Sequence, residues 1–164
     1  MFFGSPKLKK LLFVCLGNIC RSPSAEGVMA HLIKKEGLEG KIKVDSAGMI
    51  GFHAGEQADP RSRKHAEKRG VEITSIARQF RPNDDFHGFD YILAMDKKNL
   101  SDLKNLDKKG EFAHKIFMMT DFCRNKKVKE VPDPYYLGAN GFELVLDILE
   151  DSCVGLLDKI KQEI

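Results

Sequence analysis

The stretch Leu11-Leu12-Phe13-Val14-Cys15-Leu16-Gly17-Asn18-Ile19-Cys20-Arg21-Ser22-Pro23 joins an apolar run to a short polar loop and the start of a helix. Four consecutive apolar residues are typical of a buried strand, and proline is favoured in the first turn of a helix. A strand, a loop and a helix in this order direct backbone N–H groups and the positive end of the helix dipole toward one point. Residues 15–22, called the cradle from here on, therefore predict a binding site for a phosphate-like anion.

The cradle also contains a nucleophile. Helix N-termini and neighbouring cations favour the thiolate form of a cysteine, so Cys15 is the predicted attacking group. Gly17 and Asn18 tolerate the left-handed backbone that a tight loop needs, and the planar fork of Arg21 fits two phosphate oxygens. The hydroxyl of Ser22 can donate a hydrogen bond to the sulfur. We expect attack on phosphorus and a phosphocysteine intermediate, although a cysteine after a buried strand is usually a small core residue.

Apolar runs of strand length alternate with helical patterns along the rest of the chain. We expect strands at residues 11–14, 41–44, 91–95 and 116–119, with a turn at residues 45–48. Helices are expected after Pro23, from an Asp59 cap to about Arg69, through residues 100–106, and from near Gly141 to the C-terminus. This alternation predicts an α/β single-domain three-layer sandwich, with a central four-stranded parallel sheet and helices on both faces.

Composition limits the classes of function. The 164 residues suffice for one domain, which we expect to span residues 10–164 after a tail at residues 1–9. A net charge of +3 is too small to indicate a nucleic-acid partner, and no membrane span is predicted. Four cysteines in a chain without a secretory signal favour a reducing, cytoplasmic location. We expect no metal and no cofactor.

A second candidate site follows the last predicted strand. Asp133 precedes Pro134, Tyr135 and Tyr136 in a long irregular segment. Departure of a phenolate requires a proton, and a carboxylic acid can supply it and then act as a base toward water. The two tyrosines can form walls for a flat aromatic substrate. Taken alone this stretch is a weak signal, but beside a cysteine cradle it predicts the general acid.

The chain resembles the low-molecular-weight protein tyrosine phosphatase family. The resemblance runs from about residue 10 to the C-terminus and rests on several segments: Val14-Cys15-Leu16-Gly17-Asn18-Ile19-Cys20-Arg21-Ser22-Pro23, Val44-Asp45-Ser46-Ala47-Gly48, Ala77-Arg78-Gln79, Phe89-Asp90-Tyr91-Ile92, Ala94-Met95-Asp96 and Asp133-Pro134-Tyr135-Tyr136. It implies hydrolysis of phosphotyrosine in protein substrates, with phosphate or vanadate as ligands of the cradle.

The resemblance also implies roles for individual residues. Cys15 is the nucleophile, Arg21 the phosphate clamp, Asp133 the acid and base, and Ser22 the stabiliser of the thiolate. Asn18 is expected to hold the cradle backbone, with Ser46 bonding to it from the next loop. The phosphate would contact Leu16, Gly17, Asn18, Ile19, Cys20 and Arg21. Cys20 is expected to form a reversible disulfide with Cys15 under oxidants.

The chain departs from common members of the family at three places. Phe52 occupies the position of a pocket aromatic that is often Trp or Tyr. Ser75 stands where a histidine is common, which leaves the matching acid Glu26 without that partner. Met49-Ile50 replaces smaller polar residues. We assign no role to His53 or His65, because scattered histidines are usually surface residues.

Three alternatives remain open from the sequence. An arsenate reductase on the same fold needs resolving cysteines near the cradle, and Cys123 and Cys153 are not where that family places them. Protein-arginine phosphatases tend to have Thr at the position of Ile19 and lack the paired tyrosines. A non-catalytic phosphate-binding module would be favoured by loss of the cysteine, the arginine or the aspartate, and all three residues are present.

Overall fold

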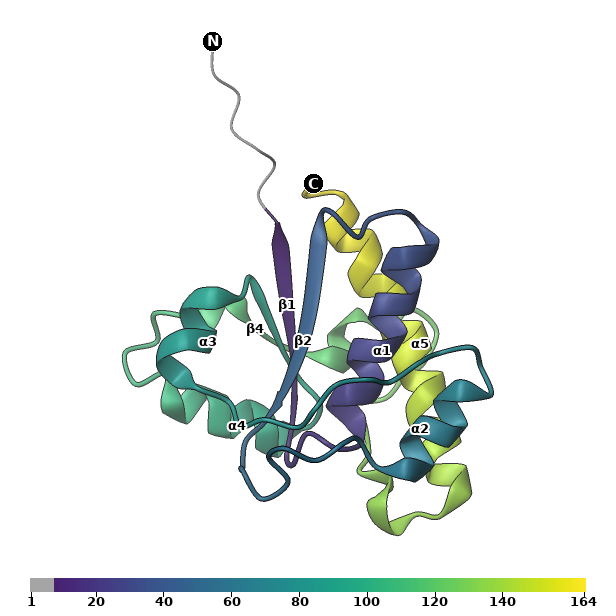
Figure 1. Ribbon diagram of the computed structural model, residues 1–164. Coiled ribbons are helices and arrows are strands. Elements are labelled where there is room, and N and C mark those ends of the chain that lie inside the picture. Colours follow the sequence, from purple (N-terminus) through teal and green to yellow (C-terminus); the bar gives the residue numbers. More distant parts are fainter. Residues whose placement is uncertain (1–7) are drawn as a thin grey trace.

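The computed structural model describes residues 8–164, and it contains one parallel sheet between two layers of helices (Figure 1). The strands are β1 (Lys9–Cys15), β2 (Ile42–Gly48), β3 (Tyr91–Ala94) and β4 (Ile116–Met118), in the spatial order β2-β1-β3-β4. The chain therefore moves outward from β1 in both directions. Ligands of such sheets bind beyond the carboxyl ends of the strands where the order reverses, which here is the end of β1.

Alternate residues of β1 enter two separate hydrophobic clusters. Leu11, Phe13 and Cys15 belong to the larger cluster, whereas Leu12 and Val14 belong to the smaller one. Residues 11–14 have no solvent-exposed surface, because both faces of the strand are covered. The apolar run seen in the sequence is thus the signature of a central strand in a doubly covered parallel sheet.

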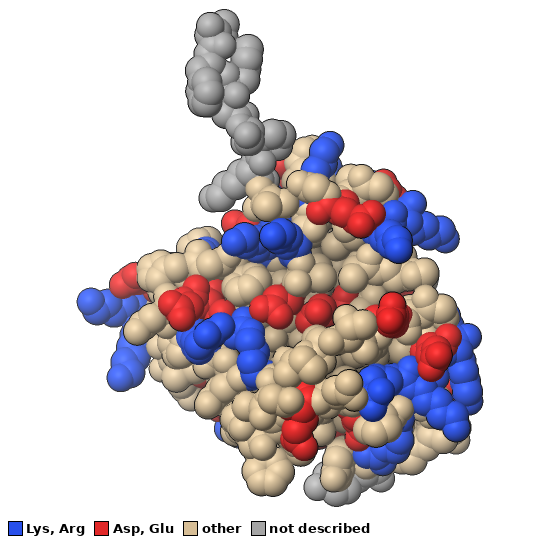
Figure 2. Space-filling model, in the orientation of Figure 1, with Lys and Arg blue, Asp and Glu red and all other residues tan. Residues whose placement is uncertain are grey.

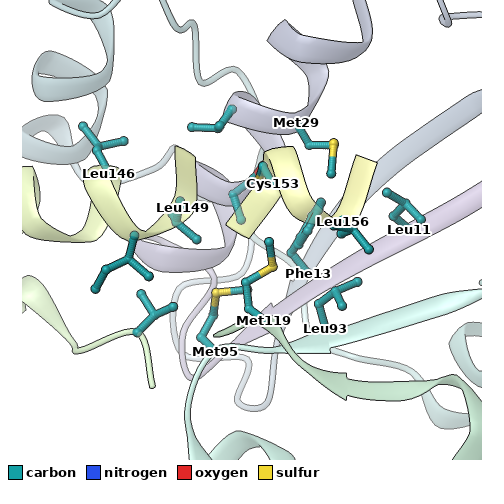
Figure 3. Packing of buried hydrophobic residues seen from close by; sticks show 14 of the residues in the cluster. Leu11, Phe13, Met29, Leu93, Met95, Met119, Leu146, Leu149, Cys153 and Leu156 are labelled. Carbon is teal, nitrogen blue, oxygen red and sulfur yellow. The ribbon is translucent and has the colours of Figure 1, made fainter. Parts of the chain in front are cut away.

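The helices divide between the two clusters. Helices α1 (Arg21–Lys35) and α5 (Ala139–Lys161) contribute to the larger cluster, whereas α3 (Pro82–Gly88) and α4 (Lys97–Leu106) contribute to the smaller one on the other face (Figure 1). Figure 3 shows Leu149, Cys153 and Leu156 of α5 above Phe13 and Leu93 of the sheet. Helix α2 (Pro60–Glu67) packs on α5. Three short 3₁₀ segments complete the chain: η1 (Ala113–Lys115), η2 (Met119–Phe122) and η3 (Pro134–Tyr136).

The predicted fold class is confirmed, and the predicted cap of α2 is present. Asp59 accepts a hydrogen bond from the backbone N–H of Arg61, and Gly70 has a left-handed φ of 76° shortly after the helix ends. The element bounds differ by a few residues from those expected. Helix α1 begins at Arg21 rather than at Pro23, and β1 includes Lys9, which the sequence assigned to the tail.

The predicted turn at residues 45–48 is wrong, because β2 continues through it to Gly48. Its residues pair in register with β1, from Asp45 opposite Leu12 to Gly48 opposite Cys15. Asp, Ser and Gly favour turns in isolation, but pairing with a central strand overrides that preference. Helix α3 was not predicted, since its seven residues give too short a pattern for helical periodicity to be recognised.

Candidate active site

The cradle makes a sharp backbone turn and leaves several backbone amides without an acceptor among residues 8–164. Asn18 adopts a left-handed φ of 57° without being a glycine, which confirms the expected backbone turn. Among the residues that the structure describes, none accepts a hydrogen bond from the backbone amides of residues 16–20. By contrast, the carbonyl of Leu16 accepts from Ile50, and that of Ile19 accepts from Asp59. The amides therefore remain available as donors for an anion.

A chain of side-chain hydrogen bonds links the nucleophile Cys15 to Ser22 and Asn18 of the cradle. Cys15 Sγ lies 3.0 Å from Ser22 Oγ, and Asn18 Nδ2 donates to the same oxygen at 2.8 Å. The backbone N–H of Arg78 donates to Asn18 Oδ1 at 3.0 Å and fixes the amide from the other side. Ser22 Oγ accepts from Asn18, and its own hydrogen can point at the Cys15 sulfur or at the carbonyl of Ala47, which lies 3.5 Å away. The predicted contact of Ser22 with the sulfur is present, whereas the Asn18 side chain bonds to the Ser22 hydroxyl and to the backbone of Arg78 rather than to the cradle backbone.

Arg21 lies at the start of α1 with only 4% of its side chain exposed. Its Nη1 donates to Asp96 Oδ2 at 2.6 Å and to the carbonyl of Val131 at 3.1 Å. Burial alone would lower the pKa of Arg21, but the nearby Cys15 and Asp96 outweigh it and raise that pKa. Asp96 comes just after β3, and Val131 comes just before Asp133 in the chain. These two residues therefore fix the guanidinium as a cation beside the Cys15 thiol.

Asp133 lies across the cleft from the cradle, as the N-cap of η3. Its Oδ1 accepts from the backbone N–H of Tyr135 at 3.1 Å, and its Oδ2 lies 3.8 Å from Arg21 Nη2. The side chain is 42% exposed, so it can exchange protons with solvent. Tyr135 is half-exposed at the same mouth, whereas the side chain of Tyr136, also predicted to form the pocket, lies outside the part that the structure describes.

These groups share one cleft of about 310 Å³ at the carboxyl end of β1. Its floor is formed by the cradle and its walls by two loops. Phe52, which was predicted to form a wall, is 82% exposed at the rim. The lining residues are Cys15, Leu16, Gly17, Ile19, Cys20, Arg21, Ile50, Phe52, His53, Asp133 and Tyr135. The structure thus brings together the cysteine, arginine and aspartate that the sequence proposed, with two of the three aromatic residues.

Comparison with known proteins assigns the chain to a family. The family described as low molecular weight phosphotyrosine protein phosphatase matches residues 10–164. The chain belongs to this family. A Drosophila melanogaster relative, named low molecular weight phosphotyrosine protein phosphatase 1, is 41% identical over 157 residues, with 95% of this chain and 99% of the relative covered.

Solved structures agree with the observed fold. The phosphatase matches a protein tyrosine phosphatase from Entamoeba histolytica with a TM-score of 0.90 at 48% identity, covering 94% of this chain and 98% of that one. It also matches YfkJ from Bacillus subtilis with a TM-score of 0.90 at 39% identity, covering 98% and 99% of the two chains. The family predicted from the sequence is therefore confirmed.

Cys20 of the phosphatase occupies a position unlike that of Cys15. All four cysteines are free thiols, and Cys20 Sγ lies 3.8 Å from Asp59 Oδ2. Burial raises the pKa of Cys20 to about 12, and the charge of Asp59 acts in the same direction. The Asp59 carboxylate also forms an ion pair with Arg61, whose Nη2 lies 2.8 Å from Asp59 Oδ2. Cys20 is therefore held as a thiol under resting conditions.

The predicted bond between Ser46 and Asn18 is wrong. Ser46 lies within β2 rather than in a loop, and its hydroxyl donates to Glu26 Oε1 at 2.6 Å. Both polar atoms of the Asn18 amide bond to Ser22 and Arg78 instead. Burial raises the pKa of Glu26, with the Ser46 hydrogen bond opposing it. Ser46 thus supplies a hydrogen bond from β2 to the Glu26 carboxyl on α1.

Sequence reasoning missed three residues of the phosphatase site. Asp96 and Arg78 were quoted only as parts of family segments, yet one anchors Arg21 and the other anchors Asn18. His53 was given no role, yet it lines the cleft. Asp96 and Arg78 each act through a hydrogen bond to a residue at least sixty positions away, so local sequence patterns contain no signal for them.

Within residues 8–164, no helix is both long and apolar enough to cross a membrane. Over the same residues, no group of three or more histidine, cysteine and acidic side chains is arranged to hold a metal ion.

Basic side chains gather over α2, and acidic side chains form a band across the sheet above it (Figure 2).

Proposed function

We propose that this phosphatase hydrolyses phosphotyrosine in protein substrates through a phosphocysteine formed on Cys15. The proposal rests on the arrangement of three side chains around the cradle. The Cys15 thiol contacts the Ser22 hydroxyl, in a loop whose backbone amides have no acceptor among the described residues. The buried Arg21 lies beside it, and the exposed Asp133 lies 3.8 Å from that arginine. The cleft between them is bordered by aromatic and aliphatic side chains, which suit a phenyl ring. Phosphate and vanadate are the expected ligands of the same loop.

The first step transfers the phosphoryl group to sulfur. The amides of residues 16–20 and the guanidinium of Arg21 bind the phosphoryl oxygens and neutralise their charge. Cys15 Sγ forms a bond to phosphorus while the bond between phosphorus and the phenolic oxygen breaks. Asp133 gives its proton to the departing oxygen, and the hydroxyl of Ser22 stabilises the thiolate before attack.

The second step restores the enzyme. A water molecule attacks phosphorus, the bond between phosphorus and sulfur breaks, and phosphate leaves. Asp133, now ionised, accepts the proton of that water, so each turnover returns the acid to its starting state. Ser22 donates to the thiolate that departs, which makes sulfur a better leaving group. The bonds and protons of the two steps balance without an oxidant, a reductant or a cofactor.

The experiment compares phosphate release from peptides with phosphotyrosine, phosphoserine and phosphoarginine, for the wild type and Cys15→Ser in the presence of EDTA. We expect Cys15-dependent release from phosphotyrosine alone, unaffected by the chelator. Preference for phosphoarginine would move the chain to the class of the Drosophila arginine phosphatase, whose solved structure it matches at 32% identity. Release by Cys15→Ser equal to that of the wild type would contradict a cysteine nucleophile.

We further propose that Cys20 protects Cys15 from irreversible oxidation. Peroxide converts the Cys15 thiolate to a sulfenic acid, and attack by Cys20 sulfur on that sulfur forms a disulfide with release of water. After peroxide treatment, thiol reductant should restore activity to the wild type but not to Cys20→Ser. Cys123→Ser is the matched control, because Cys123 lies outside the cleft. Equal recovery of both variants would contradict the role of Cys20.

The remaining proposals concern the whole chain. We take residues 10–164 as one catalytic domain, in agreement with the extent of the family match. We propose a cytoplasmic location, because a reactive thiolate requires a reducing compartment. The basic side chains over α2, next to the segment that forms the cleft wall, favour the approach of phosphorylated substrates.

A further inference from the structure

Arg61 lies at the start of α2 and reaches the segment that contains the general acid. Its Nη1 donates to the carbonyl oxygen of Tyr135 at 3.4 Å. The half-exposed guanidinium also lies over two aromatic rings, 5.1 Å from the centroid of Tyr135 and 4.8 Å from that of Phe142. Contacts between a cation and the face of a ring are attractive. Since Tyr135 belongs to η3 and Phe142 to α5, this one side chain joins three elements.

Asp59 fixes the guanidinium in this place. Arg61 Nε and Nη2 donate to the two oxygens of the Asp59 carboxylate at 3.1 and 2.8 Å, a bidentate arrangement that the planar fork of arginine allows. Asp59 is buried, and its backbone N–H donates to the carbonyl of Ile19 in the cradle at 2.8 Å. The cradle therefore determines the position of Asp59, and Asp59 determines that of Arg61.

The backbone of Tyr135 connects Arg61 to Asp133. The carbonyl of Tyr135 accepts from Arg61, and its N–H donates to Asp133 Oδ1 at 3.1 Å. The other oxygen of that carboxylate, Oδ2, lies 3.8 Å from Nη2 of Arg21. Arg61 is not among the described residues that line the cleft. It therefore contacts the acid's segment without contacting the site where the substrate binds.

We propose that Arg61 is a positioning residue that holds Asp133 where it can protonate the leaving group. The proposal rests on the proposed function, in which Asp133 is the general acid. Proton transfer requires the carboxyl group within hydrogen-bond reach of the departing oxygen. Because η3 has only three residues, contacts from neighbouring elements fix where it lies. Without the arginine, η3 loses its connection to Asp59 and the cradle, and the acid is less often in place.

The test compares two aryl phosphates whose leaving groups differ in their need for a proton. Phenol has a pKa of about 10, so release of phenolate from phenyl phosphate depends on the general acid. Dinitrophenyl phosphate releases a stable phenolate without protonation. The measured quantity is the kcat/KM of the dinitrophenyl ester divided by that of the phenyl ester, because kcat/KM includes the step that forms the phosphocysteine. Loss of folded protein lowers both values equally and leaves the ratio unchanged.

We expect Arg61→Gln to raise this ratio by about 5- to 20-fold, a part of the roughly 10²- to 10⁴-fold that a general acid contributes. Arg61→Lys keeps the charge but cannot bond to Asp59 and Tyr135 together, so it should raise the ratio almost as much. Arg63→Gln is the matched control and should keep the wild-type ratio. Arg63 lies on the same helix, but its Nε donates to the carbonyl of Ala58.

A double substitution shows whether Arg61 acts through the acid. Asp133→Ala alone should raise the ratio more than Arg61→Gln does, because it removes the proton donor. Adding Arg61→Gln to Asp133→Ala should change the ratio no further, since the two residues act as one unit. A further rise in the double variant would mean that Arg61 stabilises the leaving group by another route, which would overturn the proposal.

Two other results would also overturn the positioning role: a wild-type ratio in Arg61→Gln, or a wild-type ratio in Arg61→Lys, which would assign the effect to charge alone. Failure of the proposed function has a separate signature. Asp133→Ala would then keep the wild-type ratio, and there would be no acid at this position for Arg61 to hold.

Discussion

At the scale of single residues, the site depends on Ser22, whose hydroxyl contacts Cys15, Asn18 and the carbonyl of Ala47. Ser22 accepts from Asn18 and faces Cys15 sulfur, so one hydroxyl connects the backbone turn to the nucleophile. The side chain has no exposed surface, so water cannot replace it. The geometry therefore assigns Ser22 a part in both steps of the reaction.

Replacing Ser22 by alanine should lower kcat by roughly 10- to 100-fold, because a hydrogen bond to a charged group is worth about 1.5–3 kcal/mol. The measurement is steady-state phosphate release from an aryl phosphate. Ser152→Ala is the matched control, a buried serine of α5 whose hydroxyl donates to its own helix. An unchanged kcat in Ser22→Ala would remove this serine from the mechanism.

Asp59 gives a prediction for stability against pH. Burial alone would raise the pKa of Asp59, but hydrogen bonds from Arg61 lower it. The carboxylate therefore stabilises the fold above the ordinary pKa of about 3.9, and this contribution is lost as pH falls through the lowered value. Asp59→Asn keeps the helix cap and removes the charge. It should cost about 1 kcal/mol near neutral pH, since Arg61 is half exposed and solvent screens the pair.

The measurement for Asp59→Asn is urea unfolding at a series of pH values. The difference from the wild type should shrink below about pH 4, where the wild-type carboxylate becomes protonated and loses the charge that Asp59→Asn already lacks. Asp102→Asn is the control, because Asp102 forms an exposed pair with Lys98 within one helix. If the difference in the free energy of unfolding grew as the pH fell, the pKa of Asp59 would not be lowered by folding, which would contradict the stabilising role of its charge.

At the scale of elements, the end of β2 presses on the cradle. A Cβ atom on Gly48 would lie 2.8 Å from the carbonyl oxygen of Leu16, and this contact is with backbone that must move to relieve it. Gly48 also receives and gives the hydrogen bonds that tie the strand to Arg78 and Phe80. The close approach explains why a glycine ends this strand, and it makes the cradle's shape depend on β2.

Gly48→Ala should destabilise the protein by about 1–3 kcal/mol and reduce kcat/KM more than the loss of folded protein explains. Urea unfolding and phosphate release measured on the same sample separate the two effects. Gly40→Ala is the matched control, because a Cβ there meets no atom within 4 Å. Full activity of Gly48→Ala would show that the loop tolerates displacement.

Some of the elements and contacts could be predicted from the sequence, and others could not. The strand, cradle and helix around Cys15 were predictable because all of their determinants are local, and the Asp59 cap was predictable for the same reason. The extension of β2 to Gly48 and the bond from Ser46 to Glu26 were not, since both arise from partners on β1 and α1. The role of Asp96 likewise depends on β3 ending beside α1. These features depend on contacts between residues that are far apart in the sequence, so no local sequence pattern predicts them.

At the scale of the whole molecule, the sheet is covered on both faces and β1 supplies both clusters. Phe13 is fully buried in the larger one, in contact with the layer of α1 and α5 (Figure 3). Phe13→Ala should lower the free energy of unfolding by about 3–5 kcal/mol, a large share of the total for a domain of this size. Urea unfolding measures it, with the rim residue Phe52→Ala as a control expected within about 0.5 kcal/mol. Equal costs for the two changes would contradict the assignment of the core.

The most direct test of the account is mass spectrometry of the phosphatase during turnover of a phosphotyrosine peptide, quenched in acid and digested. The wild type is quenched within the first turnovers, because Asp133→Ala would slow the formation of the intermediate as well as its hydrolysis. We expect one phosphoryl group on the peptide that contains Cys15, and none on the same peptide of Cys15→Ser. A phosphoryl group on another residue, or turnover with none on Cys15, would contradict the proposed mechanism.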